Sequence, residues 1–216
     1  MRLTAKVKLL PTPEQADALR HTLETANAAC DYISERAWEA QTFRQYSLHK
    51  LVYYDVRERF GLSSQVTVRC ISKVADAYKL DRRTKRVFRK TGAIAYDSRT
   101  LRWKEAEQSV SIWTMAGRQT IPFACGERQR EQLKHQKGES DLALVDGVFY
   151  LLGTCDVDTP EPIELEEALG VDLGIVNIAT DGDGETHSGA HVNGLRTRHA
   201  RLRAKLQQIG TELATD

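Results

Sequence analysis

The sequence lacks the features that mark several protein classes. No apolar stretch approaches the roughly 18 residues that a membrane-spanning helix needs, and residues 1–10 do not have the form of a signal peptide. The cysteines lie far apart and form no CxxC pair, which argues against a zinc site and against a disulfide-rich fold; they are Cys30, Cys70, Cys125 and Cys155. We therefore expect a cytoplasmic protein with reduced thiols, no zinc and no membrane partner.

The chain also lacks an even distribution of charge. Its formal net charge is only +1, but residues 1–104 hold 21 lysines and arginines against 11 acidic residues, and the remainder holds 10 against 19. No lysine or arginine occurs from Gly138 to Leu195. The first half is therefore suited to a polyanion. The second half would bind phosphate only through a divalent cation.

The spacing of apolar residues predicts three helices near the N-terminus. Residues 2–10 alternate in the manner of a half-buried strand, and Thr12–Gln15 form a capping box that starts a long helix with one apolar stripe reaching Ala40. Two further amphipathic helices are expected, one at 47–61 and one after Ser63–Ser64. Three such helices in succession predict a small bundle.

After the helices, the period of the apolar residues changes to two. Strands are expected at 93–104, 108–115 and 118–124, with a short helix at 127–135. Asp146-Gly147 between two apolar runs predicts a hairpin with a type I′ turn. We expect these strands and the first strand to form one β-module, which makes the fold α+β and the helical bundle an insertion.

The C-terminal part has its own pattern. An acidic, proline-containing segment at 159–167 reads as a linker. A strand at 169–180, an acidic turn at 181–184 and a basic helix capped by Asn193 are expected to follow. A strand pair and one helix cannot close a core, so we expect the last domain to be incomplete.

The segment GVDLGIVNIAT, from Gly170 to Thr180, is the strongest indication of chemistry. Asp172 interrupts an apolar strand, and a carboxylate buried there without a partner would be costly, so a divalent metal is a good candidate partner. Gly174 lies on the same face and would leave room for a ligand. Two alternatives are a structural acid satisfied by backbone N–H groups and the opening strand of an actin-like sugar kinase. The acidic turn that follows would repel phosphate, which disfavours the kinase.

This segment closely resembles the first RuvC motif of the TnpB family, transposon-encoded relatives of type V CRISPR effectors. ANAACDYISERAW and LVYYDVRERFGLSSQVTVRCISKVADAY are similar to the family's helical recognition lobe. IAYDSRTLRW, TIPF and LALVDGVFYLLGTCDV are similar to its wedge β-barrel. The resemblance implies a wedge-like β-barrel (1–12 and 93–158), an inserted helical recognition lobe (13–92), an acidic linker (159–167) and an incomplete ribonuclease H-like, or RuvC, domain (168–216).

The same resemblance implies an activity. In the TnpB family, the aspartate that matches Asp172 is a catalytic, Mg²⁺-binding carboxylate, and a guide RNA selects the target DNA that is cut. The family's remaining Glu and Asp and its zinc ribbon have no match in this sequence. Because two-metal hydrolysis needs several carboxylates, we expect this chain not to cut DNA. The alternative is a nuclease-dead protein of the same family that only binds nucleic acid.

A cationic run at residues 79–90 (KLDRRTKRVFRK) is the candidate nucleic-acid contact. An isolated charge run is often only a solvated loop, but this one leaves the bundle within the basic half of the chain. We predict contacts with the phosphate backbone, without base specificity, from Lys79, Arg82, Arg83, Lys85, Arg86, Arg89 and Lys90. The basic face at 196–205 is equally consistent with nucleic-acid contact or with solvation. His187 and His191, with Gly189 between them, are not expected to hold a metal.

Overall fold

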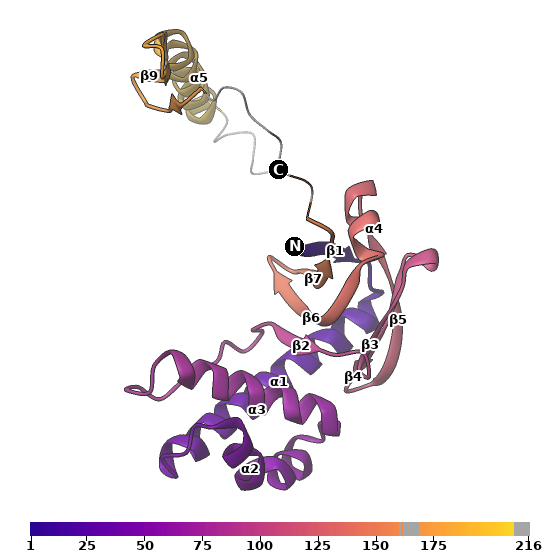
Figure 1. Cartoon of the computed structure of the whole chain (residues 1–216). Coiled ribbons are helices and arrows are strands. Elements are labelled where there is room, and N and C mark those ends of the chain that lie inside the picture. The colour runs from indigo at the N-terminus through magenta and orange to yellow at the C-terminus, as the bar shows by residue number, and fades with distance from the viewer. Residues whose placement is uncertain (160, 162–168, 210–216) are drawn as a thin grey trace. The chain divides into compact units, whose positions relative to one another are not determined.

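The computed structural model describes residues 1–159, 161 and 169–209, and these belong to two units (Figure 1). The larger unit, Met1–Thr159, combines a helical part with a β-part. The smaller unit, within Pro160–Asp216, contains three short strands and a helix. Most of the expected linker at 159–167 lies outside the described residues. None of the described helices is long and apolar enough to cross a membrane.

The expected bundle consists of α1 (Pro13–Glu39), α2 (Gln45–Phe60) and α3 (Ser64–Leu80), which pack against one another. The capping box at the start of α1 is present, with the Thr12 and Gln15 side chains each accepting from the other's backbone N–H. α2 begins two residues before the expected start, and it has no side-chain cap that the sequence could have signalled. The apolar stripes meet in a core in which the following side chains are fully buried: Leu19, Leu23, Ile33, Leu48, Val52, Ile71 and Val74.

Seven antiparallel strands of the larger unit form a nearly closed, barrel-like sheet in the order β2-β6-β7-β1-β5-β4-β3. The first strand pairs along most of its length with β7 and at its C-terminal end with β5, so it belongs to the sheet as expected. The helices therefore lie in the chain between two strands of one sheet. The strands are β1 (Arg2–Leu9), β2 (Ile94–Tyr96), β3 (Leu101–Lys104), β4 (Ser109–Thr114), β5 (Gly117–Ala124), β6 (Gln136–Val145) and β7 (Val148–Asp156).

The single strand expected at 93–104 is wrong, because β2 and β3 are separate strands at opposite ends of the sheet order. Asp97 causes the break. Its carboxylate accepts hydrogen bonds from the backbone N–H groups of Arg99 (3.1 Å) and Thr100 (3.2 Å). An aspartate that accepts from its own backbone two or three residues later favours a turn over a continuing strand.

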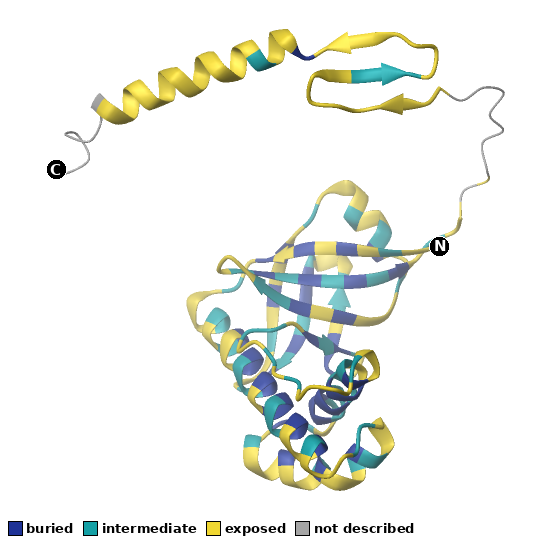
Figure 2. Cartoon of the chain, turned by 90° about the vertical axis from the view of Figure 1, so that its left-hand side faces the viewer, coloured by how far each residue is buried: buried dark blue, intermediate teal, exposed yellow. Residues whose placement is uncertain are grey.

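The interior of the barrel follows the alternation of the strands, and Figure 2 shows buried and exposed residues alternating along them. Gly153 makes room for the ring of Trp103, since a Cβ at this position would lie 3.1 Å from it. Helix α4 (Glu127–Leu133) covers part of this core with the buried side chain of Leu133. The β6–β7 hairpin turns at Asp146-Gly147, where both residues have positive φ (48° and 78°), as the expected type I′ turn requires.

The smaller unit has a three-stranded sheet of β8 (Val171–Asp172), β9 (Asn177–Asp181) and β10 (Thr186–Ser188), followed by α5 (Ala190–Ile209). The strand expected at 169–180 is interrupted between β8 and β9. The helix begins three residues before the expected cap, Asn193. In Figure 2 this unit is almost entirely exposed, in contrast to the barrel and bundle.

Candidate nucleic-acid interface

The cationic segment 79–90 is fastened to α1 by a row of polar side chains. Asn27, Asp31 and Ser34 recur at spacings of four and three, which places them on one face of the helix. The Ser34 hydroxyl donates to the carbonyl of Arg86 (2.6 Å), and the Asp31 carboxylate accepts from the backbone N–H of Phe88 (2.7 Å). The backbone of the segment is therefore held in a defined position.

The two ends of this row are buried, and both are satisfied. Asn27 is fully buried and donates to the carbonyl of Gly92 (2.7 Å), while its own oxygen accepts from Lys73 Nζ (2.7 Å). Ser34 is also fully buried and lies 2.8 Å from the hydroxyl of Tyr78, which accepts from the backbone N–H of Arg86 (3.2 Å). Buried polar groups that lose such partners are costly, so these contacts stabilise the bundle as well as the segment.

The seven predicted cations lie on this segment, with Lys79 still on α3, and the structure gives them different partners. Three of them form ion pairs with acids of the larger unit: Lys79 with Asp76 (2.6 Å), Arg86 with Asp81 (2.8 Å) and Lys90 with Glu24 (3.3 Å). Arg86 is half-buried and also donates twice to the Asp81 carbonyl (2.7 and 3.1 Å). Its role is therefore largely to hold the segment together.

Three other cations are open to a ligand. Arg83, Lys85 and Arg89 are exposed, and within the described residues none of them has a carboxylate within 4.0 Å. The backbone N–H of Arg83 donates to the Asp81 carboxylate (2.8 Å) and lowers its pKa, so Asp81 stays ionised. This carboxylate pairs with Arg86 and not with the three open cations. Arg82 differs, since its Nε donates weakly to the Tyr78 carbonyl (3.4 Å).

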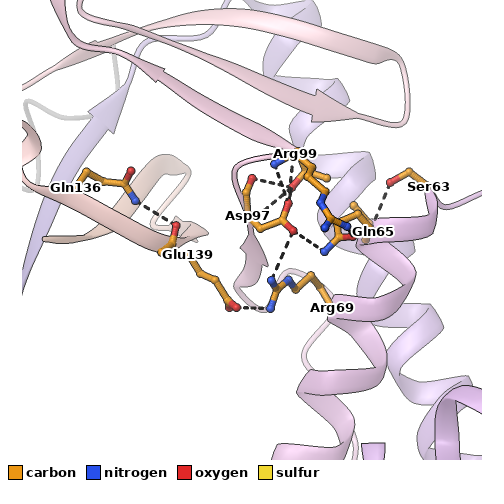
Figure 3. Close-up of polar contacts among 10 residues, drawn as sticks. Ser63, Gln65, Arg69, Asp97, Arg99, Gln136 and Glu139 are labelled. Atoms are coloured by element: carbon orange, nitrogen blue, oxygen red, sulfur yellow. Dashed lines mark hydrogen bonds and ion pairs between the residues drawn. The ribbon is translucent and has the colours of Figure 1, made fainter. Parts of the chain in front are cut away.

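A polar cluster that the sequence analysis missed joins the bundle to the barrel (Figure 3). The carboxylate of Asp97 accepts from Gln65 and pairs with Arg69 (3.6 Å), both on α3, and Arg69 also pairs with Glu139 on β6. Arg99 donates to the Gln65 side chain (3.0 Å). The signal that could have indicated this cluster is Asp97, a charged residue in the middle of the strand expected at 93–104.

The electrostatics of this junction favour an ionised Asp97. Burial raises the pKa of Asp97, but hydrogen bonds from Thr100 and from the N–H groups of Arg99 and Thr100, together with the charge of Arg69, outweigh burial and lower it. The ion pairs thus connect α3, the β2–β3 turn and β6 at neutral pH. This connection holds the N-terminal half of α3 against the barrel.

Asp172 does not lie where the sequence analysis expected. It pairs with Thr180 at the end of the two-residue strand β8, and its side chain is exposed and not buried in an apolar strand. Gly174 is explained by the backbone, because a Cβ there would lie 2.8 Å from the carbonyl oxygen of Asn177. The close approach of the chain to itself requires this glycine, and the expected space for a ligand is not needed to explain it.

Among the described residues, Asp172 does not belong to a group of side chains that could hold a metal ion. Within the described residues, the one group of three metal-ligand side chains in the smaller unit comprises Asp181, Glu185 and His187, and it excludes Asp172. The carboxylate of Asp181 already accepts from the N–H groups of Asp183 (3.1 Å) and Glu185 (2.7 Å). Exposed acidic groups of this kind are common without a metal. A single exposed carboxylate does not provide the ligand set that two-metal hydrolysis needs.

Comparison with known proteins identifies the fold but not the family. No protein-family model matches the sequence, and no curated protein does. The fold is similar to that of a chain in the cryo-EM structure of a CRISPR-Cas12f ternary complex, with a TM-score of 0.51 and 10% sequence identity. The match covers 93% of this chain and 53% of that chain, so this chain spans about half the length of its structural neighbour. At this identity the likeness shows the fold alone.

Proposed function

We propose that this chain is the nucleic-acid-binding part of a transposon-encoded, RNA-guided DNA endonuclease of the TnpB type, and that it does not cut DNA by itself. The observation that carries the proposal is the combination of a Cas12f-like fold with a cationic segment fastened to the helical bundle. The barrel and the bundle would act as the wedge-like and recognition lobes that hold a guide RNA.

The binding step follows from the charges on the segment. Arg83, Lys85 and Arg89 are exposed without an acidic partner among the described residues, so they can neutralise phosphates and release counterions when nucleic acid binds. Because the Ser34 and Asp31 contacts hold the backbone of the segment, these side chains lose less conformational freedom on binding. Phosphate contacts position the nucleic acid, and base pairing with the guide would select the target.

The chemical step of the proposed function would need Mg²⁺ and a set of carboxylates. In the intact family Mg²⁺ would be held by Asp172 together with further carboxylates, and it would activate water and stabilise the leaving oxygen. Here Asp172 is exposed, and among the described residues it is not part of the group formed by Asp181, Glu185 and His187. We propose Asp172 as the family's catalytic carboxylate on the basis of its motif, and we expect no cleavage from this chain.

RNA binding tests the first part of the proposal. Changing Arg83, Lys85 and Arg89 to Gln should weaken binding of a structured RNA by at least tenfold at low salt. It should also reduce the slope of log K against log salt by about two to three, because each lost phosphate contact removes about one unit. The matched control changes three exposed cations of the barrel side, Arg102, Arg128 and Arg130, to Gln. Equal loss in both variants would mean that net charge alone drives binding and would contradict the proposal.

A cleavage assay tests the second part. The chain with Mg²⁺, an RNA guide and a matching DNA duplex should leave the DNA intact, because one carboxylate cannot hold two cations. Sustained nicking of the duplex that disappears in Asp172→Ala would show a complete active site and overturn this part. Nicking that persists in Asp172→Ala would instead identify a contaminating nuclease.

A nuclease-dead nucleic-acid-binding protein is the second candidate function, and the exposure of Asp172 favours it. Calorimetric titration with Mn²⁺, a sensitive substitute for Mg²⁺, tests whether Asp172 binds a metal ion in this chain. The binding-only function predicts identical heats for the wild-type chain and Asp172→Asn. A saturable site that the substitution removes would support the endonuclease assignment.

A further inference from the structure

Helix α2 carries a row of aromatic and cationic side chains that the proposed function does not use. Tyr46, Lys50, Tyr53 and Arg57 recur at spacings of four, three and four, so they share one face of the helix, with His49 and Tyr54 at its edges. We call these six residues the α2 strip. In Figure 1, α2 lies on the side of the bundle away from the strands.

The side chains of the strip are ordered by contacts with one another. The rings of His49 and Tyr53 stack at 4.4 Å with an interplanar angle of 20°, and Tyr54 meets Tyr53 edge-on at 5.2 Å. Lys50 Nζ lies 4.5 Å from the centre of the Tyr46 ring, and the Arg57 guanidinium lies 5.7 Å from that of Tyr53. The strip therefore alternates aromatic faces with positive charge.

Tyr53 packs in part against the core of the bundle, but folding of the bundle does not explain the two outer tyrosines of the strip, Tyr46 and Tyr54. The buried face of α2 consists of Leu48, Val52 and Val56, whereas Tyr46 is 72% exposed and Tyr54 is 81% exposed. Large aromatic side chains gain their stability from burial, and these two gain little here. An exposed row of this kind points to a ligand that itself has flat apolar faces.

The charge of the strip limits what that ligand can be. Within the described residues, neither Lys50 nor Arg57 has a carboxylate within 4.0 Å. Of the two acids on α2, Asp55 is engaged by the hydroxyl of Tyr32, and Glu58 occupies a helical position outside the strip. A ligand with aromatic faces and negative charge fits this arrangement, and single-stranded nucleic acid has both.

We propose that the α2 strip binds the unpaired bases of single-stranded DNA. Tyr46 and Tyr54 are eight residues apart, or about 12 Å along the helix axis, which matches roughly three to four stacked nucleotides. The choice of DNA rests on the proposed function, because pairing of a guide with one DNA strand leaves the other strand unpaired. Lys50 and Arg57 would neutralise phosphates between the stacked bases.

The experiment measures binding of the full chain to two fluorescent 12-nucleotide DNA strands, oligo-dT and an abasic strand of the same length. Tyr46→Ala with Tyr54→Ala should weaken oligo-dT binding by at least about tenfold, because each base stacked on an aromatic ring contributes a factor of five or more. Binding of the abasic strand should not change. Replacement of both tyrosines by Phe should restore oligo-dT binding to within about twofold, since the ring is kept.

The control variant is Leu51→Ala, an exposed apolar side chain of α2 outside the strip, and it should bind like the wild type. Unchanged oligo-dT binding in the double Ala variant would overturn the proposal, as would an equal loss for the abasic strand. Tighter binding of oligo-rU than of oligo-dT would overturn the choice of DNA. Light scattering that shows a wild-type dimer and a monomeric double variant would make the strip a contact between copies.

The outcome can be separated from that of the proposed function. The strip variants should keep their affinity for structured RNA, which depends on Arg83, Lys85 and Arg89. If the triple variant of Arg83, Lys85 and Arg89 loses RNA binding but keeps oligo-dT binding, RNA and single-stranded DNA bind to separate surfaces. RNA binding that does not respond to the triple variant would contradict the proposed function while the oligo-dT measurement still tests the strip.

Discussion

The two units of the chain differ in how far their apolar side chains are buried. In the larger unit, the apolar residues of the helices and strands form one continuous buried core. In the smaller unit, the side chains of Leu173, Ile175 and Val176 are 77, 85 and 79% exposed. Both regions have strand-like apolar patterns in the sequence. The difference shows that such a pattern produces a continuous, buried strand only where other elements pack against it.

The two units also differ in the candidate functional residues that they carry. The cationic segment belongs to the larger unit, where buried partners on α1 fix its position. Asp172 belongs to the smaller unit, where its side chain faces solvent. The proposal of nucleic-acid binding therefore rests on an ordered surface of this chain, whereas the proposal of a catalytic role for Asp172 rests on its sequence motif.

The largest expected effect is the loss of stability when a buried leucine of the larger unit is truncated. Leu151→Ala in strand β7, where the side chain is 0% exposed, should lower the free energy of unfolding by about 2–5 kcal/mol. Leu173→Ala, at a side chain that is 77% exposed, should change it by less than about 0.5 kcal/mol. Urea unfolding followed by circular dichroism measures both. A large loss for Leu173→Ala would show that the smaller unit has a core of its own and would remove the contrast.

The junction between bundle and barrel should make stability depend on pH. The pKa of Asp97 is lowered in the folded state, so its contribution is present above the ordinary value of 3.8 and is lost as pH falls through the lower, folded pKa. Asp97→Asn should therefore cost about 1.5–3 kcal/mol at pH 7, as expected for hydrogen bonds to a charged group. The difference from wild type should shrink below pH 3.8. A difference that stays constant down to pH 2 would mean that the charge of Asp97 contributes nothing.

Removing the Ser34 hydroxyl should show how much the attachment of the cationic segment to α1 contributes to stability. Ser34→Ala removes the hydrogen bond to the Arg86 carbonyl and leaves buried groups without a partner, so it should cost about 1–3 kcal/mol. Amides of residues 82–89 should also exchange faster with solvent. Ser72→Ala on α3, at a partly exposed serine, is the matched control and should stay within about 0.5 kcal/mol. Equal effects of the two variants would contradict the assigned role of Ser34.

The smallest expected effect concerns backbone conformation. Gly147 has a φ of 78°, which side-chain-bearing residues adopt only with strain, so Gly147→Ala should destabilise the larger unit by about 1 kcal/mol. Gly170 in the smaller unit has no positive φ and open space around it, so Gly170→Ala should have almost no effect. Thermal unfolding compares the two. A stabilising Gly147→Ala would show that the hairpin does not need this turn in solution.

Much of the fold could be predicted because its signals are local. The capping box at Thr12, the apolar stripes of the three helices and the Asp146-Gly147 turn each depend on residues only a few positions apart. The cationic segment is visible in the sequence itself, and its contact with nucleic acid stays a prediction. The prediction failed at 93–104 and at 169–180, where the backbone contacts of Asp97 and the close approach at Gly174 interrupt the strand pattern.

The sequence by itself determined the helices, the main hairpin, the order of basic and acidic regions and the positions of the cations. Only the tertiary structure decided which of those cations have no carboxylate partner among the described residues, and that α2 exposes Tyr46 and Tyr54. It also decided that Asn27, Asp31 and Ser34 hold the segment. The physical reason is that helices and turns are set by neighbours in the chain. Burial, ion pairing and exposure depend on groups that are far apart in sequence and meet only when the chain has folded.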